Sequence, residues 1–109
     1  MKKQKNKFNN VIVFDGEEKF DSQKEYNRWR ELCLLERARV INGLKRQIPF
    51  TLIEKSQYGR EITYVADFCY WENGKYIVED TKSEITKTPL YRLKKRLMAE
   101  LHGIIILET

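Results

Sequence analysis

Apolar residues first take up helical spacing between residues 22 and 40. Ser22 followed by Glu25 matches the capping box that begins many helices, and Gly43 comes shortly after the expected end. The apolar stripe predicted to face the core consists of Tyr26, Trp29, Leu32, Cys33 and Val40. We therefore expect one long amphipathic helix here.

A second helix is predicted for residues 88–103. Thr88 stands in the N-cap position, Pro89 in the first helical position, and Gly103 at the end. Its predicted core-facing stripe consists of Leu90, Leu93, Leu97 and Leu101.

The other apolar runs are short and predict strands. Residues 10–20 contain two runs around the turn signal Asp15-Gly16, which predicts an N-terminal hairpin. The Pro49 position favours an edge or a bulge for its strand. The remaining predicted strands are residues 45–55, 62–71, 75–82 and 104–108. This order predicts the α/β class, with a small mixed sheet flanked by two helices.

Composition limits the possible functions. A chain of 109 residues fits one domain, here residues 1–109, with residues 1–9 as a basic arm. No apolar stretch is long enough for a membrane span and no signal-peptide core is visible, which predicts a cytoplasmic protein. Cys33 and Cys69 are too few for a zinc site and are interpreted as buried thiols. The net charge of +5 favours a polyanionic partner.

The segment YVADFCYWENGKYIVEDTK carries the candidate chemistry. If Asn73-Gly74 forms a type I′ turn, Asp67 lies directly opposite Asp80. This is a non-hydrogen-bonded pair, in which the Cα atoms approach to about 4.5 Å. Two opposed carboxylates repel each other unless a cation lies between them. Oxygen ligands suit Mg²⁺ or Mn²⁺, so the pattern predicts a divalent metal site.

Two neighbours complete the predicted site. Lys82 projects from the same face as Asp80 and would place an ammonium group beside the ion. The main-chain carbonyl of Thr81 is a further candidate ligand. Glu79 points to the opposite face, unless a one-residue bulge exchanges it with Asp80.

Glu25 has two interpretations that the sequence leaves balanced. Its carboxylate would fold back onto the Ser22 amide in a capping box. Alternatively, its place beside the Trp29 stripe lets it reach a metal site above the sheet. Gln47, a polar residue that opens a strand, is interpreted first as a structural hydrogen-bonding residue and second as a neighbour of the metal.

Glu25, Asp67, Asp80 and Lys82 together resemble the PD-(D/E)XK nuclease superfamily. The segments DGEEKFDSQKEYNRWREL, YVADF, VEDTK and YRLKKRL are similar to small phage-encoded endonuclease-like proteins catalogued as a domain of unknown function. The resemblance extends from about residue 6 to 107, and Ala66 stands where the superfamily pattern has Pro. It implies a restriction-endonuclease-like core and metal-dependent DNA cleavage, in the cytoplasm of a bacterial host if the protein is phage-encoded.

Three surfaces are candidates for DNA contact: the N-terminal lysines, the loop around Gln57 and Tyr58, and the second helix. A solvated face that only balances charge is the competing interpretation of the helix. The candidate DNA-binding residues are Lys3, Lys5, Lys7, Arg60, Arg92, Lys94, Lys95 and Arg96.

We therefore expect a metal-dependent endodeoxyribonuclease, with branched or processed DNA as candidate substrates and the substrate structure left open. Symmetric cutting of two strands needs two sites, so a homodimer is a reasonable expectation. Two rival functions stay open. One is a non-catalytic DNA-binding protein that keeps the nuclease fold, and the other is a phage protein that acts on a host partner.

Overall fold

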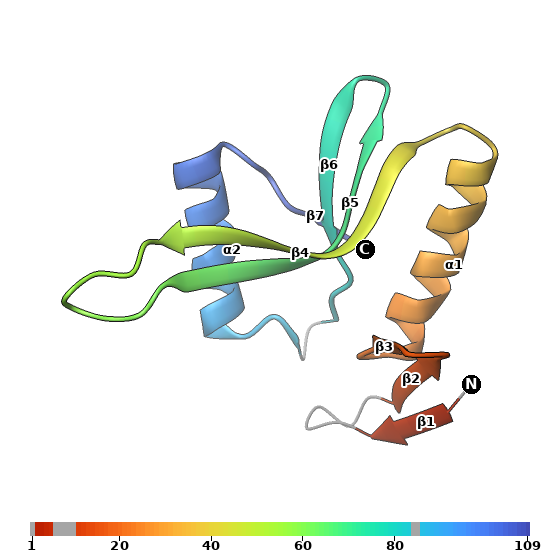
Figure 1. Cartoon of the computed structure of the whole chain (residues 1–109), viewed down its shortest axis with the longest axis horizontal. Helices are drawn as coiled ribbons and strands as arrows, with labels where there is room; N and C mark the ends of the chain where they lie inside the picture. Colours follow the sequence, from red (N-terminus) through yellow and green to blue (C-terminus); the bar gives the residue numbers. More distant parts are fainter. Residues whose placement is uncertain (1, 6–10, 84–85) are drawn as a thin grey trace.

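Two β-sheets and two α-helices make up the described part of the chain (Figure 1). The computed structural model describes residues 2–5, 11–83 and 86–109, and for residues 2–5 it describes the backbone alone. The predicted mixed α/β class is confirmed. Within the described residues, no helix combines the length and the apolar character needed to cross a bilayer.

The smaller sheet lies at the N-terminus. Its antiparallel strands are β1 (Lys2–Lys5), β2 (Val11–Asp15) and β3 (Glu18–Phe20), in that order. The predicted hairpin is confirmed as β2 and β3, but its turn lies one residue later than predicted: Asp15 pairs with Glu18, so Gly16 and Glu17 form the turn. Residues assigned to the basic arm add β1 as a third strand, a pairing that the polar sequence does not signal.

Helix α1 (Gln23–Arg37) begins as predicted and ends earlier. The Ser22 side chain accepts a hydrogen bond from the Glu25 amide, as an N-cap does. The helix stops three residues before the predicted end because Arg39 takes a left-handed conformation, with φ of 63°. Gly43 is therefore not its cap and lies in the next strand, where a Cβ would approach Trp71 to 3.2 Å. Val40, assigned to the stripe, is outside the helix and 50% exposed.

The larger sheet contains β4 (Asn42–Ile53), β5 (Ile62–Glu72), β6 (Lys75–Asp80) and β7 (Leu107–Glu108), in that order. Neighbouring strands β4, β5 and β6 are antiparallel, whereas β7 runs parallel to β6. The edge position of β4 agrees with its proline. The last strand is shorter than the predicted residues 104–108, and the sheet is mixed, as expected.

The β5–β6 hairpin has the predicted register. Asn73 and Gly74 both have positive φ, 51° and 76°, as a type I′ turn requires. Pairing continues without a bulge from the turn to Phe68 and Glu79. Asp67 and Asp80 are the next opposed positions, so the bulged alternative, in which Glu79 would replace Asp80, is excluded.

Strands β4 and β5 bend sharply midway along their length, so that one end of the pair lies near α1 and the other near α2 (Figure 1). Leu44, Phe68 and Tyr70 pack in the core beside α1. Tyr64 and Ala66 of the same strand pack in the core beside α2. The bend therefore separates two small cores and places the middle of the sheet between the helices.

Helix α2 (Pro89–His102) has the predicted caps and a different buried face. Thr88 accepts from the Tyr91 amide, and Gly103 ends the helix with φ of 66°. Tyr91 and Met98 are the buried residues, whereas the predicted stripe is mostly exposed, with Leu90 at 60% and Leu93 and Leu101 at 54%. The predicted stripe is wrong because Tyr91 and Met98 fill the space over the sheet and rotate the leucines outward.

Candidate metal and catalytic site

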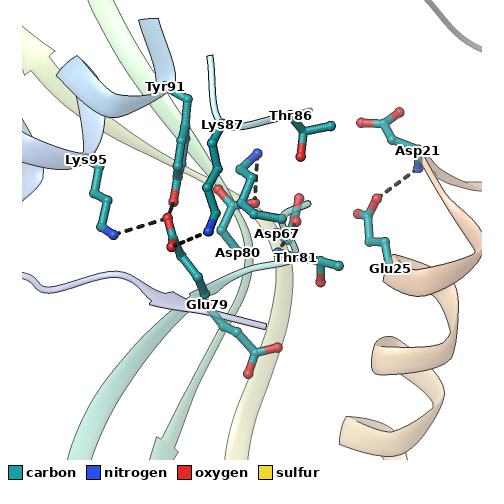
Figure 2. Close-up of polar contacts among 12 residues, drawn as sticks. Asp21, Glu25, Asp67, Glu79, Asp80, Thr81, Thr86, Lys87, Tyr91 and Lys95 are labelled. Carbon is teal, nitrogen blue, oxygen red and sulfur yellow. Dashed lines mark hydrogen bonds and ion pairs between the residues drawn. The ribbon is translucent and has the colours of Figure 1, made fainter. Parts of the chain in front are cut away.

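An open cleft of about 730 Å³ lies where the sheet meets the N-terminal ends of both helices. It brings together all of the predicted catalytic residues and the predicted carbonyl donor, which come from α1, β5, β6 and the segment after β6. These residues are Glu25, Asp67, Asp80, Thr81 and Lys82. Figure 2 shows Glu25 on α1 across from Asp67 and Thr81.

Asp80 is 2% exposed and is held from two sides. One carboxylate oxygen, Oδ2, accepts a short hydrogen bond from the Tyr64 hydroxyl, and the other, Oδ1, lies 3.3 Å from Lys82 Nζ. Asp67 Oδ2 accepts from the Thr81 main-chain amide at 2.9 Å. The two carboxylates therefore have fixed orientations before any ligand enters.

The carboxylate pair is electrostatically strained, as the sequence predicted. Burial, followed by hydrogen bonding to Asp80 and the negative charges of Asp80 and Glu25, raises the pKa of Asp67 to about 9. The metal-free pair therefore favours one bound proton, which belongs to the pair of carboxyl groups together. A cation that binds between the two groups would displace this proton.

Glu25 lines the cleft and also caps its helix. One carboxylate oxygen, Oε2, accepts from the Asp21 amide at 2.8 Å, one residue before the Ser22 amide that the capping box predicts. The other, Oε1, accepts from Gln47 Nε2 at 3.4 Å and lies 3.7 Å from Arg46 Nη2. Burial is the main cause that raises the pKa of Glu25. The capping role is confirmed in this shifted form, and the role as a metal ligand stays a prediction.

The donor set fits a hydrated ion with few protein ligands. Among the residues that the structure describes, no three His, Cys, Asp or Glu side chains are grouped closely enough to hold a metal ion. Asp67 and Asp80 are adjacent, while Glu25 is held at the helix start (Figure 2). Mg²⁺ commonly keeps several waters and uses one or two carboxylates, so this pair suits Mg²⁺ or Mn²⁺.

Lys82 is fixed by its surroundings as well as by Asp80. Its Nζ lies 4.4 Å from the centroid of the Tyr91 ring. Its main-chain amide donates to the Thr109 carbonyl at 3.0 Å, and its own carbonyl accepts from Lys24 Nζ at 2.9 Å. The ammonium group therefore stands at the carboxylate pair with limited freedom.

Sequence reasoning missed the groups that hold Asp80 and Glu79 in place. Tyr64, which binds Asp80, carries no local signal beyond its place on the strand. Glu79 lies on the opposite face, as predicted, but it is fully buried and not merely a neighbour. Its carboxylate forms two hydrogen bonds with the Arg28 guanidinium, at 2.7 and 2.8 Å, and accepts one from the Tyr70 hydroxyl at 2.7 Å.

The predicted DNA-binding residues whose side chains the structure describes lie on α2 and in the loop between β4 and β5. Lys94 lines the cleft, and Arg92 and Arg96 are exposed on α2. Lys95 forms an ion pair with Glu108 at 3.1 Å, and its contact with DNA stays a prediction. Arg60 is exposed in the loop that joins β4 to β5, and this loop lies away from α1 (Figure 1). Lys7 and the side chains of Lys3 and Lys5 lie outside the described part of the structure.

Comparison with known proteins gives a family without an assigned activity. No curated protein and no solved structure matches the chain. A family model described as "Protein of unknown function (DUF1064)" matches residues 3–104, almost the whole chain. The chain therefore belongs to the DUF1064 family.

Proposed function

We propose that the protein is a divalent-metal-dependent endodeoxyribonuclease with a restriction-endonuclease-like core. The observation that carries the proposal is the opposed pair of Asp67 and Asp80 in an open cleft, with Lys82 Nζ 3.3 Å from Asp80. The resemblance to the PD-(D/E)XK superfamily supports the same activity. A buried carboxylate pair with a raised pKa and a charged partner is typical of functional sites.

Each residue has a distinct role in this proposal. Asp67 and Asp80 would hold Mg²⁺ or Mn²⁺, which when bound polarises a phosphoryl oxygen and lowers the pKa of a bound water. Lys82 stabilises the negative charge that develops on the phosphate, because its ammonium group is already aimed at the pair. The Tyr64 hydroxyl keeps Asp80 oriented. Glu25 lies on the opposite side of the cleft, where it accepts hydrogen bonds from the Asp21 amide and the Gln47 side chain.

The cleft is framed by cations that suit a phosphate backbone. Lys24 donates to the Lys82 carbonyl and Lys94 lines the cleft on the α2 side. Arg92 and Arg96 extend this positive surface along the exposed side of α2. A homodimer with two such clefts would cut both strands of a duplex or a junction.

The direct test is a cleavage assay on linear, nicked, flapped and four-way DNA with Mg²⁺, Mn²⁺ or EDTA. We expect metal-dependent cleavage of at least one substrate, and loss of that cleavage in Asp80→Asn. Binding should be measured on the same substrates. Binding without cleavage under every condition would favour the non-catalytic DNA-binding protein. The absence of both binding and cleavage would favour a protein that acts on a host partner.

A further inference from the structure

Gln47 has a backbone conformation that its strand does not require. Its φ is 53°, in the left-handed region, although it lies inside β4 and is not glycine. Such a conformation costs free energy for a residue with a Cβ, and it persists only where surrounding contacts compensate. The contact described for the side chain is the hydrogen bond to Glu25.

The place of Gln47 in the sheet connects it to both sides of the cleft. The neighbouring pairs, Arg46 with Phe68 and Ile48 with Ala66, put Gln47 opposite Asp67. The residue lines the cleft. Along β4 it lies between Leu44, which packs in the core beside α1, and Ile48, which packs in the core beside α2.

The chemistry of an amide suits a site of like charges. One oxygen of Glu25 is bound by the Asp21 amide, and the other, Oε1, faces two groups from β4: Gln47 Nε2 at 3.4 Å and the Arg46 guanidinium at 3.7 Å. An amide N–H orients a carboxylate without neutralising it, and the amide oxygen remains an acceptor for water. A glycine would adopt the same φ with less strain, so the backbone conformation alone does not account for a glutamine here.

We propose that Gln47 is a positioning residue of this site. Its left-handed backbone directs the side-chain amide across the cleft, where it holds the Glu25 carboxylate toward Asp67 and Asp80. This inference rests on the proposed nuclease function for its kinetic consequence. Its structural consequence, that the free protein carries strain at Gln47 for the sake of the side chain, is independent of the substrate.

Gln47→Gly tests both consequences, and Arg39→Gly is its matched control. Arg39 also has a left-handed backbone, with φ of 63°, but lies in the exposed turn after α1 and does not line the cleft. Both substitutions should leave the melting temperature in EDTA equal to or above the wild-type value, because glycine relieves the strain. Only Gln47→Gly should lower kcat, by about 10- to 100-fold as for groups that orient metal ligands, with KM little changed.

A readout independent of cleavage separates this inference from the proposed function. The Mg²⁺ or Mn²⁺ concentration that gives half of the maximal rise in melting temperature should increase about 10-fold in Gln47→Gly and stay unchanged in Arg39→Gly. If wild type binds metal but cleaves no DNA, the nuclease proposal fails and this comparison still decides the role of Gln47.

Gln47→Asn distinguishes the loss of the side-chain amide from a loss of the folded structure. Asparagine tolerates the left-handed backbone and keeps an amide that is one methylene shorter, so part of the lost kcat should return. Wild-type kcat and metal response in Gln47→Gly would overturn the inference. So would a lowered melting temperature in Gln47→Gly with both stability and kcat restored by asparagine, because Gln47 would then serve the fold alone.

Discussion

Glu79 and Asp80 are consecutive buried acids with opposite surroundings. Glu79, 0% exposed, faces α1 and receives a guanidinium, a phenol and the Thr109 hydroxyl. Asp80, 2% exposed, faces the cleft, where its neighbours include a second carboxylate. Glu79 is surrounded by a cation and hydrogen-bond donors alone, whereas Asp80 has the Lys82 cation and the Tyr64 hydroxyl together with a second carboxyl group, Asp67. Burial alone therefore does not distinguish a structural acid from a ligand, whereas the charge of the partners does.

The largest expected effect is a loss of stability when Glu79 is deprived of Arg28. Arg28→Leu should lower the free energy of unfolding by about 3 kcal/mol, since it leaves a fully buried carboxylate without its cation. Urea denaturation at pH 7 measures this loss. Glu31→Ala is the control, because it removes only the exposed partner of Arg28 and should cost less than about 1 kcal/mol. Equal losses of stability in the two variants would contradict the conclusion that Arg28 neutralises the buried charge of Glu79.

The second effect separates the two acids by activity. Asp80→Asn and Lys82→Ala should each lower kcat for DNA cleavage by about 100-fold or more, while DNA binding is retained, because the lost groups act on the transition state. Glu79→Gln keeps a hydrogen-bonding side chain on the other face and should retain most activity per folded molecule. If the kcat of Asp80→Asn stayed within about threefold of the wild-type value, Asp80 would not act in catalysis.

The third effect concerns Asp67. Its pKa is raised from 3.8 to about 9, so its protonated form favours the folded state and the free energy of unfolding falls as the pH rises through this interval. Asp67→Asn removes this term and should raise the stability in EDTA at pH 8 by about 1 kcal/mol, on the scale of cross-strand pairs. The advantage should grow from pH 5 to pH 8 in thermal unfolding.

Metal should reverse that order. Wild type gains stability when Mg²⁺ binds the folded state alone, whereas Asp67→Asn lacks a charged ligand and gains less. The melting temperatures of the two proteins should therefore cross as Mg²⁺ is added. A destabilised Asp67→Asn in EDTA, with no response of either protein to millimolar Mg²⁺ or Mn²⁺, would make Asp67 a structural residue that only accepts the Thr81 amide.

A smaller effect compares Glu25 as a cap and as part of the site. Glu25→Gln keeps a side chain that serves in a capping box, so its melting temperature should stay within about 2 °C of wild type for a domain of this size. Metal-dependent cleavage should nevertheless fall if the charge of Glu25 contributes to the cleft. Unchanged cleavage would mean that Glu25 serves only as a helix cap, through its hydrogen bond with the Asp21 amide.

The smallest effect tests the cations around the cleft. Removing Arg92 or Arg96 should lower the log–log slope of DNA binding against salt by about 0.9 per lost phosphate contact, with similar losses on all sequences. Lys95→Ala is the comparison, because its ion pair with Glu108 already occupies it. An unchanged slope for both arginines would return this face of α2 to an ordinary solvated surface.

Local signals were enough to predict the centre of the site. Asn73-Gly74 dictates its turn type, and the turn type sets the register that opposes Asp67 and Asp80. The helix caps at Ser22 and Thr88 were equally local. The shape around that centre was not predictable, because it depends on contacts between distant segments.

Helix α2 shows why. Its leucines outnumber its other apolar residues, but Tyr91 is the side chain that reaches Glu108 and Lys82 and thereby sets which face is buried. The backbone conformation of Gln47 has no counterpart in the local sequence, since glutamine has no preference for left-handed backbone. The partners of Glu79 also follow from the docking of α1 on the sheet, which the periodicity of α1 does not specify.

The parallel pairing of β7 with β6 has a consequence for the order in which the site assembles. Thr109 accepts from the Lys82 amide and donates its own amide to the Asp80 carbonyl, both at 3.0 Å. The β5–β6 hairpin closes a short loop and can form early. The two Thr109 bonds can form only after the chain has passed through α2 and returned to the sheet as β7. A two-residue strand is also an element that opens readily. We therefore expect the carboxylate pair to form together with the β5–β6 hairpin, and the main chain of Lys82 to be fixed later, when β7 pairs with β6.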